Sequence, residues 1–354
     1  MLQTLFHAWE RRLASVTTDR VVRPFEWGLN WISPNGHRSN AQAVQQLHDW
    51  VADVMADTDA FFTPPPTRDY HLADGSPSGD RLLTFPTALV TPHAANNTVY
   101  CRWFEARAPR GAPRAAVVVL PQWNADADGH VGLCRLLARN GLSALRLSLP
   151  YHDQRMPPEL HRADYIVSAN IARTVQVCRQ AVLDARRAIA WLAAEGYDRI
   201  GILGSSLGSC LAMLTTAHEP LIRAEACNHI SPYFADVVWR GLSTGHVRQG
   251  LDGHVDLDTL RMLWKPISPR WYLDRLRDRH TLLVYARYDL TFPVDLSEDL
   301  VREFREMNIA HEVAVLRCGH YSTGKAPFKY LDGWILMRFL KKALTGTSAI
   351  PEAR

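Results

Sequence analysis

The serine at position 206 has a sequence context that suits nucleophilic chemistry. It is the central residue of Gly204-Ser205-Ser206-Leu207-Gly208, a G-x-S-x-G sequence that follows an aliphatic run and precedes a segment with helical character. Between a strand and a helix, the small residues of this sequence allow a tight turn that projects the central side chain. A glycine-rich phosphate turn and a plain packing turn are the alternatives. We predict that Ser206 is a nucleophile.

A serine hydroxyl needs a base to take its proton and a carboxylate to orient that base. Proteins with this type of turn supply them in the chain order serine, acid, histidine. Asp289 and then His320 each follow directly after a predicted strand, so both residues lie at strand ends in that order. Asp236 is a second candidate for the acid. The sequence therefore predicts a triad of Ser206, His320 and Asp289.

The elements that position these residues alternate between short β runs and helices from about residue 98 onward. Residues 115–120 are all aliphatic, as expected of a strand buried on both faces. Apolar residues at helical spacing predict a long helix over 171–194. Such alternation indicates an α/β fold, with a mostly parallel sheet covered by helices on both faces. Sites in these sheets lie beyond the carboxyl ends of the strands.

From about residue 81 to residue 345 the chain resembles the α/β-hydrolase superfamily. The resemblance rests on the turn at 204–208, on Asp289 with Pro293, and on Gly319-His320. It implies an α/β-hydrolase fold with a mostly parallel sheet of about eight strands. It also implies the triad above and chemistry that needs no cofactor.

The same resemblance organises the chain into two parts. The catalytic domain is expected over 81–350, with a lid-like insertion at about 230–279. Residues 1–80 are expected to form a helical N-terminal extension, because apolar residues at helical spacing predict a helix over 40–56. Residues 1–31 contain three tryptophans, and peripheral contact with a membrane surface is the less favoured alternative to packing on the main domain.

Two backbone N–H groups are needed to stabilise the charge that develops on the substrate oxygen. The resemblance assigns one of them to Leu207, directly after the nucleophile. The other belongs to the loop that follows residues 115–120. Aligned on the family's usual His-Gly-x turn, which this sequence lacks, the donor is Trp123, with Gln122 as the alternative.

The loop after the predicted strand at 143–149 is expected to border the same site. Its Tyr151, His152 and Arg155 are candidate substrate contacts, and a loop held by its own hydrogen bonds is the alternative. No metal site is expected, because His152 and His161 lack helical ligand spacing and a third ligand.

Composition excludes several other classes of protein. The chain has 354 residues and a formal net charge of +4, from 40 basic and 36 acidic residues. We find no block of like charge, which argues against nucleic acid as a partner. The N-terminus has no basic region before an apolar run, and no apolar run is long enough to span a membrane. We therefore expect a cytoplasmic protein without an integral membrane segment; the oligomeric state is not predicted.

The six cysteines are scattered and form no CxxC pair, so we expect reduced, packed thiols. Cys210, near Ser206, and Cys318, near His320, belong to this group and are not expected to act as nucleophiles.

The combined prediction is a serine hydrolase that cleaves a small-molecule carboxylic ester through an acyl-enzyme. A thioesterase, a peptidase and an acyltransferase use the same triad chemistry and are alternatives. A catalytically silent ligand-binding protein on this fold is the non-enzymatic alternative.

Overall fold

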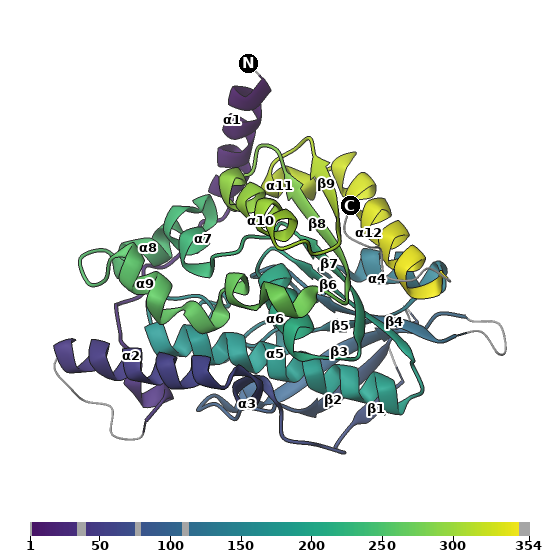
Figure 1. Ribbon diagram of the computed structural model, residues 1–354, viewed down its shortest axis with the longest axis horizontal. Helices are drawn as coiled ribbons and strands as arrows, with labels where there is room; N and C mark the ends of the chain where they lie inside the picture. Colours follow the sequence, from purple (N-terminus) through teal and green to yellow (C-terminus); the bar gives the residue numbers. More distant parts are fainter. Residues whose placement is uncertain (1, 34–39, 75–78, 108–112, 347–354) are drawn as a thin grey trace.

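A mixed sheet of nine strands forms the centre of the molecule (Figure 1). The computed structural model describes residues 2–33, 40–74, 79–107 and 113–346. The strands are β1 (His71–Ala73), β2 (Arg81–Pro86), β3 (Thr98–Phe104), β4 (Ala115–Leu120), β5 (Ser143–Leu147), β6 (Arg199–Ser205), β7 (Ile222–Asn228), β8 (His280–Ala286) and β9 (His311–Leu316).

The strands lie in the order β1-β2-β3-β5-β4-β6-β7-β8-β9. Neighbours from β1 to β5 pair antiparallel, and those from β5 through β4 to β9 pair parallel. The predicted α/β class and the mostly parallel sheet are confirmed, with nine strands where about eight were expected. The additional strand arises because β1, within the predicted helical extension, pairs with β2 through residues 71–73.

Helices cover both faces of the sheet. The α-helices are α1 (Leu2–Ser15), α2 (Asn40–Ala56), α3 (Thr58–Phe62), α4 (Val131–Arg139), α5 (Ile171–Ala194), α6 (Leu207–His218), α7 (Phe234–Arg240), α8 (Gly245–Leu251), α9 (Leu257–Leu263), α10 (Val294–Glu306), α11 (His320–Thr323) and α12 (Phe328–Thr345). Short 3₁₀ helices are η1 (Leu29–Trp31), η2 (Ala94–Asn97), η3 (Asp153–Arg155), η4 (Leu242–Thr244), η5 (Lys265–Ile267) and η6 (Pro269–Leu276).

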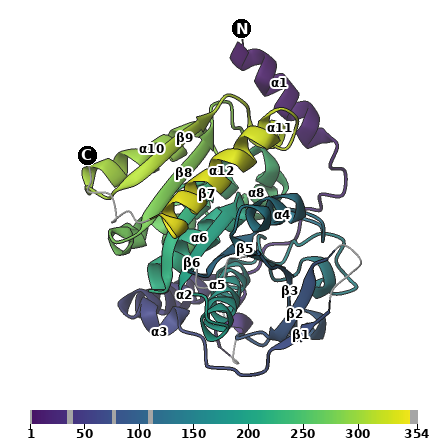
Figure 2. The ribbon, with the colours of Figure 1, turned by 90° about the vertical axis from the view of Figure 1, so that its right-hand side faces the viewer.

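Alternation along the strands divides the apolar side chains between two cores. In β4, Val118 and Leu120 point into the core covered by α5, α6 and α10, whereas Val117 and Val119 point into the core covered by α4 and α12. Figure 2 shows α4 and α12 together on one face. Burial on both faces explains why β4 is entirely aliphatic.

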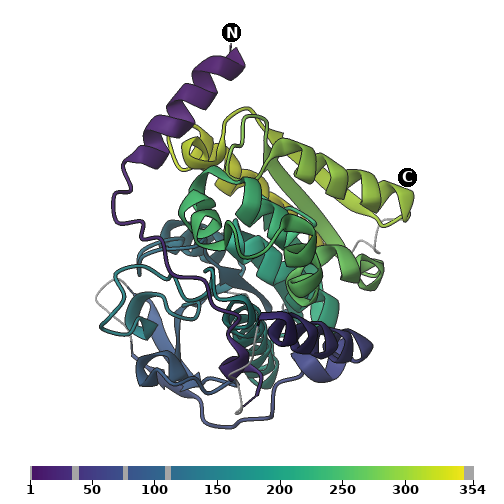
Figure 3. The ribbon, with the colours of Figure 1, turned by 90° about the vertical axis from the view of Figure 1, so that its left-hand side faces the viewer.

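The N-terminal extension is packed along the domain. Figure 3 shows its purple chain running from α1 toward α2 over one side of the molecule. Glu26 forms a parallel β-bridge with Asn170, and the Asn170 side chain donates to the Glu26 carboxylate at 2.5 Å. Its predicted helix over 40–56 is α2, as expected from the spacing of its apolar residues.

The region predicted as a lid-like insertion carries α7, α8, α9, η5 and η6. Trp264 at its centre is fully buried, and its indole N–H donates to the carbonyl of Ile171 at 3.2 Å. This contact anchors the insertion to the start of α5. Its role as a lid remains a prediction, and the predicted domain end at residue 350 lies outside the described residues. Within the described ranges, no helix is long and apolar enough to cross a membrane.

Candidate active site

The turn between β6 and α6 holds Ser206 in a backbone conformation that few residues adopt. Its φ is 54° and its ψ is −120°. The turn is closed so tightly that a Cβ on Gly204 would lie 2.0 Å from the carbonyl oxygen of Gly208. A Cβ on Gly208 would lie 2.2 Å from the carbonyl oxygen of Leu120. Both glycines are therefore required by close backbone approach, as expected of a nucleophile turn.

Ser206, His320 and Asp289 lie in one hydrogen-bonded chain. The Ser206 Oγ is 3.0 Å from His320 Nε2, and His320 Nδ1 is 2.9 Å from Asp289 Oδ2. Ser206 follows β6, Asp289 follows β8 and His320 follows β9, so parallel strand ends bring the three together. The structure thus places the three predicted residues within reach of one another, with a base next to the hydroxyl and a carboxylate behind the base.

Asp289 is held as a fixed acceptor. It is buried, and its Oδ1 accepts the backbone N–H groups of Thr291 at 2.8 Å and Phe292 at 2.7 Å. Burial by itself would raise the pKa of Asp289, but the neighbouring His320 and His229 outweigh it and hold the pKa well below its usual range. The carboxylate therefore stays ionised throughout the neutral range.

A second histidine, which is not among the residues predicted from the sequence, contacts the same carboxylate. His229 Nδ1 lies 2.9 Å from Asp289 Oδ2, and the rings of His229 and His320 are 4.5 Å apart. His229 is buried, follows β7 directly and has a φ of 58°. A signal was present, because His229 is a polar residue at the end of a parallel strand, like the three predicted residues.

His229 provides a prediction about how the acid is held. We expect His229→Ala to lower kcat about tenfold, because Asp289 loses one charge-assisted donor. The acidic limb of the kcat/KM profile should move to higher pH. Without His229, the negative charge of the Asp289 carboxylate is no longer shared between two histidines and faces His320 alone. His229→Asn should retain most activity, because an asparagine amide can donate from the Nδ1 position and tolerates positive φ. Unchanged pH profiles in both variants would contradict this role.

His229, Asp289 and His320 are also the group of side chains, among the described residues, whose ligand atoms lie close enough to hold a metal ion, within 4.8 Å of one another. Both histidine Nδ1 atoms, however, lie at hydrogen-bond distance from the same carboxylate oxygen. A metal bound through the two Nδ1 atoms would require them to present lone pairs, whereas the hydrogen bonds to Asp289 require them to carry protons. The geometry fits the hydrogen-bonded network, and the expectation that no metal is used remains a prediction.

The loop after β4 lies against the nucleophile turn, as the close approach of Gly208 to Leu120 shows. In the described part of the chain, the backbone N–H groups of Leu207, Trp123 and Gln122 donate no hydrogen bond to protein. Their place in the oxyanion-binding role therefore stays a prediction, with no competing backbone acceptor among the described residues. Leu207 as the first donor, and Trp123 or Gln122 as the second, remain predictions.

The His152 side chain holds the loop after β4 in place through hydrogen bonds. It is buried, with its Nδ1 2.9 Å from the carbonyl of Pro150 and its Nε2 accepting the backbone N–H of Asn124 at 2.9 Å. Burial lowers the pKa of His152 to about 4, so the ring is neutral near pH 7 and can accept that N–H. The Asn124 amide oxygen accepts the N–H of Ala163 at 2.8 Å. His152 thus fixes the turn that carries Trp123.

Tyr151 and Arg155 lie in the interior and face no open surface. The Tyr151 hydroxyl is 3.0 Å from His93 Nδ1. Arg155 is fully buried and pairs with Asp184 at 2.8 Å. Like His152, both side chains are engaged by interior partners, most of them outside this loop. The structure therefore offers no support for direct substrate contacts by these side chains.

The other candidates lie outside the hydrogen-bonded chain. Asp236 is ion-paired with Arg261 at 2.6 Å, so its carboxylate is engaged elsewhere. All six cysteines are free and buried. Burial raises the pKa of the Cys210 and Cys318 thiols to about 12, which leaves both protonated at neutral pH.

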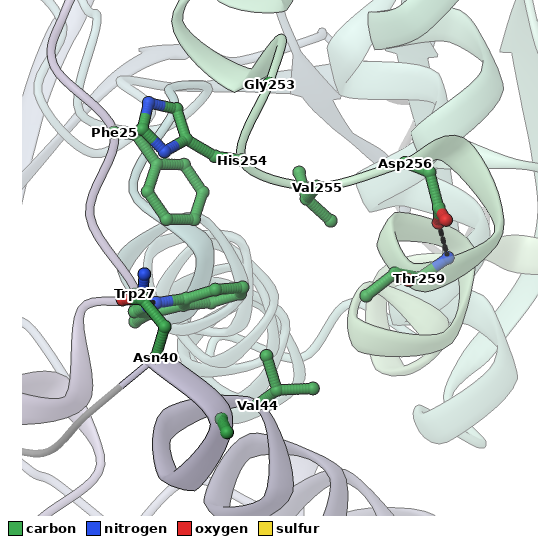
Figure 4. Close-up of a pocket in the computed structure, with 10 residues that line it drawn as sticks. Phe25, Trp27, Asn40, Val44, Gly253, His254, Val255, Asp256 and Thr259 are labelled. Atoms are coloured by element: carbon green, nitrogen blue, oxygen red, sulfur yellow. Dashed lines mark hydrogen bonds between the residues drawn. The ribbon is translucent and has the colours of Figure 1, made fainter.

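A pocket of about 330 Å³ lies between the N-terminal segment and the insertion (Figure 4). Phe25 and Trp27 line it on one side, and His254 stacks on Phe25 with ring centroids 4.5 Å apart. No residue of the triad lines this pocket. Ser206 itself is only 8% exposed, so it lies largely beneath other side chains.

The sheet order, the tight turn at Ser206 and the positions of Asp289 and His320 after neighbouring parallel strands are those of the α/β-hydrolase fold. Solved structures with this fold include an acylaminoacyl peptidase from Pyrococcus horikoshii, with 14% identity and a TM-score of 0.60 over 79% of this chain. The chain spans 43% of the length of that peptidase. An acetyl xylan esterase from Paenibacillus sp. R4 has 13% identity and a TM-score of 0.59, covering 94% of this chain and 99% of the esterase.

An esterase from Pyrococcus furiosus is similar over 80% of this chain and 98% of its own, with 15% identity and a TM-score of 0.52. No protein-family profile matches the chain, and no curated protein sequence does. The similarities establish the fold of the protein, and the residues of the site carry the argument about its chemistry.

Proposed function

We propose that the protein is a serine hydrolase that cleaves a small-molecule carboxylic ester. Ser206 Oγ attacks the ester carbonyl while His320 Nε2 takes its proton. The developing oxyanion accepts the N–H of Leu207 and a second N–H from Trp123 or Gln122. His320 then gives the proton to the leaving alcohol, and an acyl-enzyme remains on Ser206.

The second half of the reaction reverses these roles. Water replaces the alcohol, His320 takes one of its protons, and the resulting oxygen attacks the acyl carbonyl. Collapse of the intermediate releases the carboxylic acid and returns the proton to Ser206. Asp289 accepts the Nδ1–H of His320 throughout, which keeps Nε2 free to accept a proton.

The observation that carries the proposal is the hydrogen-bonded chain from Ser206 through His320 to Asp289 on a strained turn. A binding protein would have no need to hold a buried serine in this conformation next to a base. A thioesterase, a peptidase and an acyltransferase would form the same acyl-enzyme, and the neighbours include both peptidase and esterases. An ester requires less of the site than an amide does, because an alkoxide is a better leaving group than an amine; thioesters, whose thiolate leaves more readily still, are compared directly in the substrate measurement below.

A fluorophosphonate probe tests the nucleophile directly. We expect the probe to modify wild-type protein at a single serine, identified as Ser206 by peptide mass spectrometry. Ser206→Ala should abolish labelling, and Ser205→Ala, its neighbour outside the G-x-S-x-G centre, should retain it. Folded wild-type protein that does not react would overturn the proposal and favour a silent binding protein.

The substrate class requires a second measurement. Hydrolysis of p-nitrophenyl esters of increasing chain length, alongside matched thioesters and peptide anilides, ranks the three leaving groups by kcat/KM. The proposal expects the esters to be cleaved fastest. Preference for anilides or thioesters would keep the serine mechanism and replace the ester assignment.

A further inference from the structure

The turn that carries His320 is held by a residue more than three hundred positions away in the chain. Glu10, in α1, is fully buried. Its Oε2 accepts the backbone N–H of Tyr321 at 2.8 Å, and its Oε1 accepts the backbone N–H of Ser322 at 2.9 Å. These are the two residues that follow His320 in the first turn of α11.

We propose that Glu10 is a positioning residue that sets the orientation of His320, so that the N-terminal helix completes the active site. This inference rests on the proposed function, because it concerns the base of that mechanism. The helix α11 has only four residues, so its N–H groups have few partners of its own. The Glu10 carboxylate satisfies two of these groups and fixes the peptide planes next to the imidazole.

The fit between Glu10 and the turn is tight on the side of Gly319. A Cβ on Gly319 would lie 2.3 Å from the Glu10 Cδ atom, so the carboxylate packs directly on the backbone that precedes His320. Gly319 has a φ of −111°, which any residue can adopt. The requirement for glycine at this position is therefore explained by the Glu10 contact and not by backbone conformation.

Other contacts from the extension reach the same two turns. Phe6, also in α1, stacks on Tyr288 with ring centroids 4.6 Å apart, and Tyr288 precedes the acid Asp289. Arg20 donates to the Tyr321 hydroxyl at 3.0 Å. The outer end of α1 is largely solvent-exposed, with Leu2 65% exposed. Its contact with the domain is therefore concentrated where the acid and the histidine are held.

The test is Glu10→Gln, which keeps the shape of the side chain but places an amide opposite one of the N–H groups. We expect kcat for an ester to fall about tenfold to a hundredfold with KM little changed, because small displacements of a catalytic group have effects of this size. The rate of fluorophosphonate modification of Ser206 should fall by a similar factor. Activity is measured well below the thermal midpoint of each variant, and circular dichroism confirms folding.

Glu26→Gln is the matched control. Glu26 also tethers the extension, through Asn170, but it contacts no residue of the triad. We expect its kcat to stay near that of the wild-type protein. Equal losses in both variants, or a lower thermal midpoint with unchanged kcat in Glu10→Gln, would overturn the proposal and leave Glu10 with a role in stability alone.

A double-mutant cycle gives an independent test that does not depend on one variant. Gly319→Ala should displace the Glu10 carboxylate and lower kcat in the wild-type background. In a Glu10→Ala background the space is already open, so Gly319→Ala should have little further effect. Additive losses would contradict the inference.

Absence of fluorophosphonate labelling in wild-type protein would instead mean that the proposed function fails. That result would be recognised before any Glu10 variant is compared.

Discussion

Replacing Asp289 with asparagine is expected to lower kcat about ten-thousandfold while the protein remains folded. The size of the effect follows from the orientation that the site imposes on the new amide. Oδ1 of Asp289 accepts two backbone N–H groups, from Thr291 and Phe292. An asparagine must therefore keep its carbonyl oxygen at that position, because an amide NH₂ there would face two donors.

The asparagine NH₂ is then forced into the Oδ2 position, opposite the Nδ1 atoms of His320 and His229. Each histidine can satisfy it only by accepting at Nδ1, which places its single ring proton on Nε2. His320 Nε2–H would point at Ser206 and could not take the hydroxyl proton. The nucleophile would remain in place, but it would have no base.

The measurement is steady-state turnover of the best ester together with the rate of fluorophosphonate labelling. Asp236→Asn is the matched control, because it changes a buried aspartate that pairs with Arg261 and contacts no triad residue. We expect its kcat to remain near the wild-type value. If Asp289→Asn stays active and Asp236→Asn does not, the acid has been assigned to the wrong residue.

The main features of the fold could be predicted from the sequence because they depend on local patterns. The helix over 171–194 and the strand over 115–120 were predicted with the limits that the structure shows. Both carry dense apolar patterns that suit only one type of element. β1 was missed because it has only three residues and a mixed burial pattern, so pairing with β2 decides its structure.

The residues of the site also differ in whether local sequence patterns could predict them. Ser206, Asp289 and His320 could be predicted because their order and strand-end positions are properties of the sequence. Glu10 could not be predicted from the sequence. Its contact with the turn that carries His320 joins residues 311 positions apart, and no local pattern encodes such a contact. The sequence alone also could not decide whether Arg155 contacts a substrate. Whether an arginine in the loop after a strand faces a pocket or an interior carboxylate depends on a partner in a different helix.

That partner makes Arg155 the position with the largest expected effect on stability. Arg155 and Asp184 are both fully buried and 2.8 Å apart. Arg155 also donates to the carbonyls of Ser148 and Asn96, each at 3.0 Å. We expect Arg155→Met to lower the free energy of unfolding by about 3–5 kcal/mol, because it leaves the Asp184 carboxylate buried without its cation.

Denaturant unfolding followed by circular dichroism measures this change, and two comparisons identify its cause. Arg240→Met removes a partly exposed ion pair with Asp295 and should cost about 0–1 kcal/mol. Adding Asp184→Asn to Arg155→Met should restore part of the loss, because the neutral amide needs no cation and its oxygen can still accept the Thr87 hydroxyl. If the double variant is no more stable than Arg155→Met alone, the cost lies in packing around the arginine stem and not in the unpaired charge.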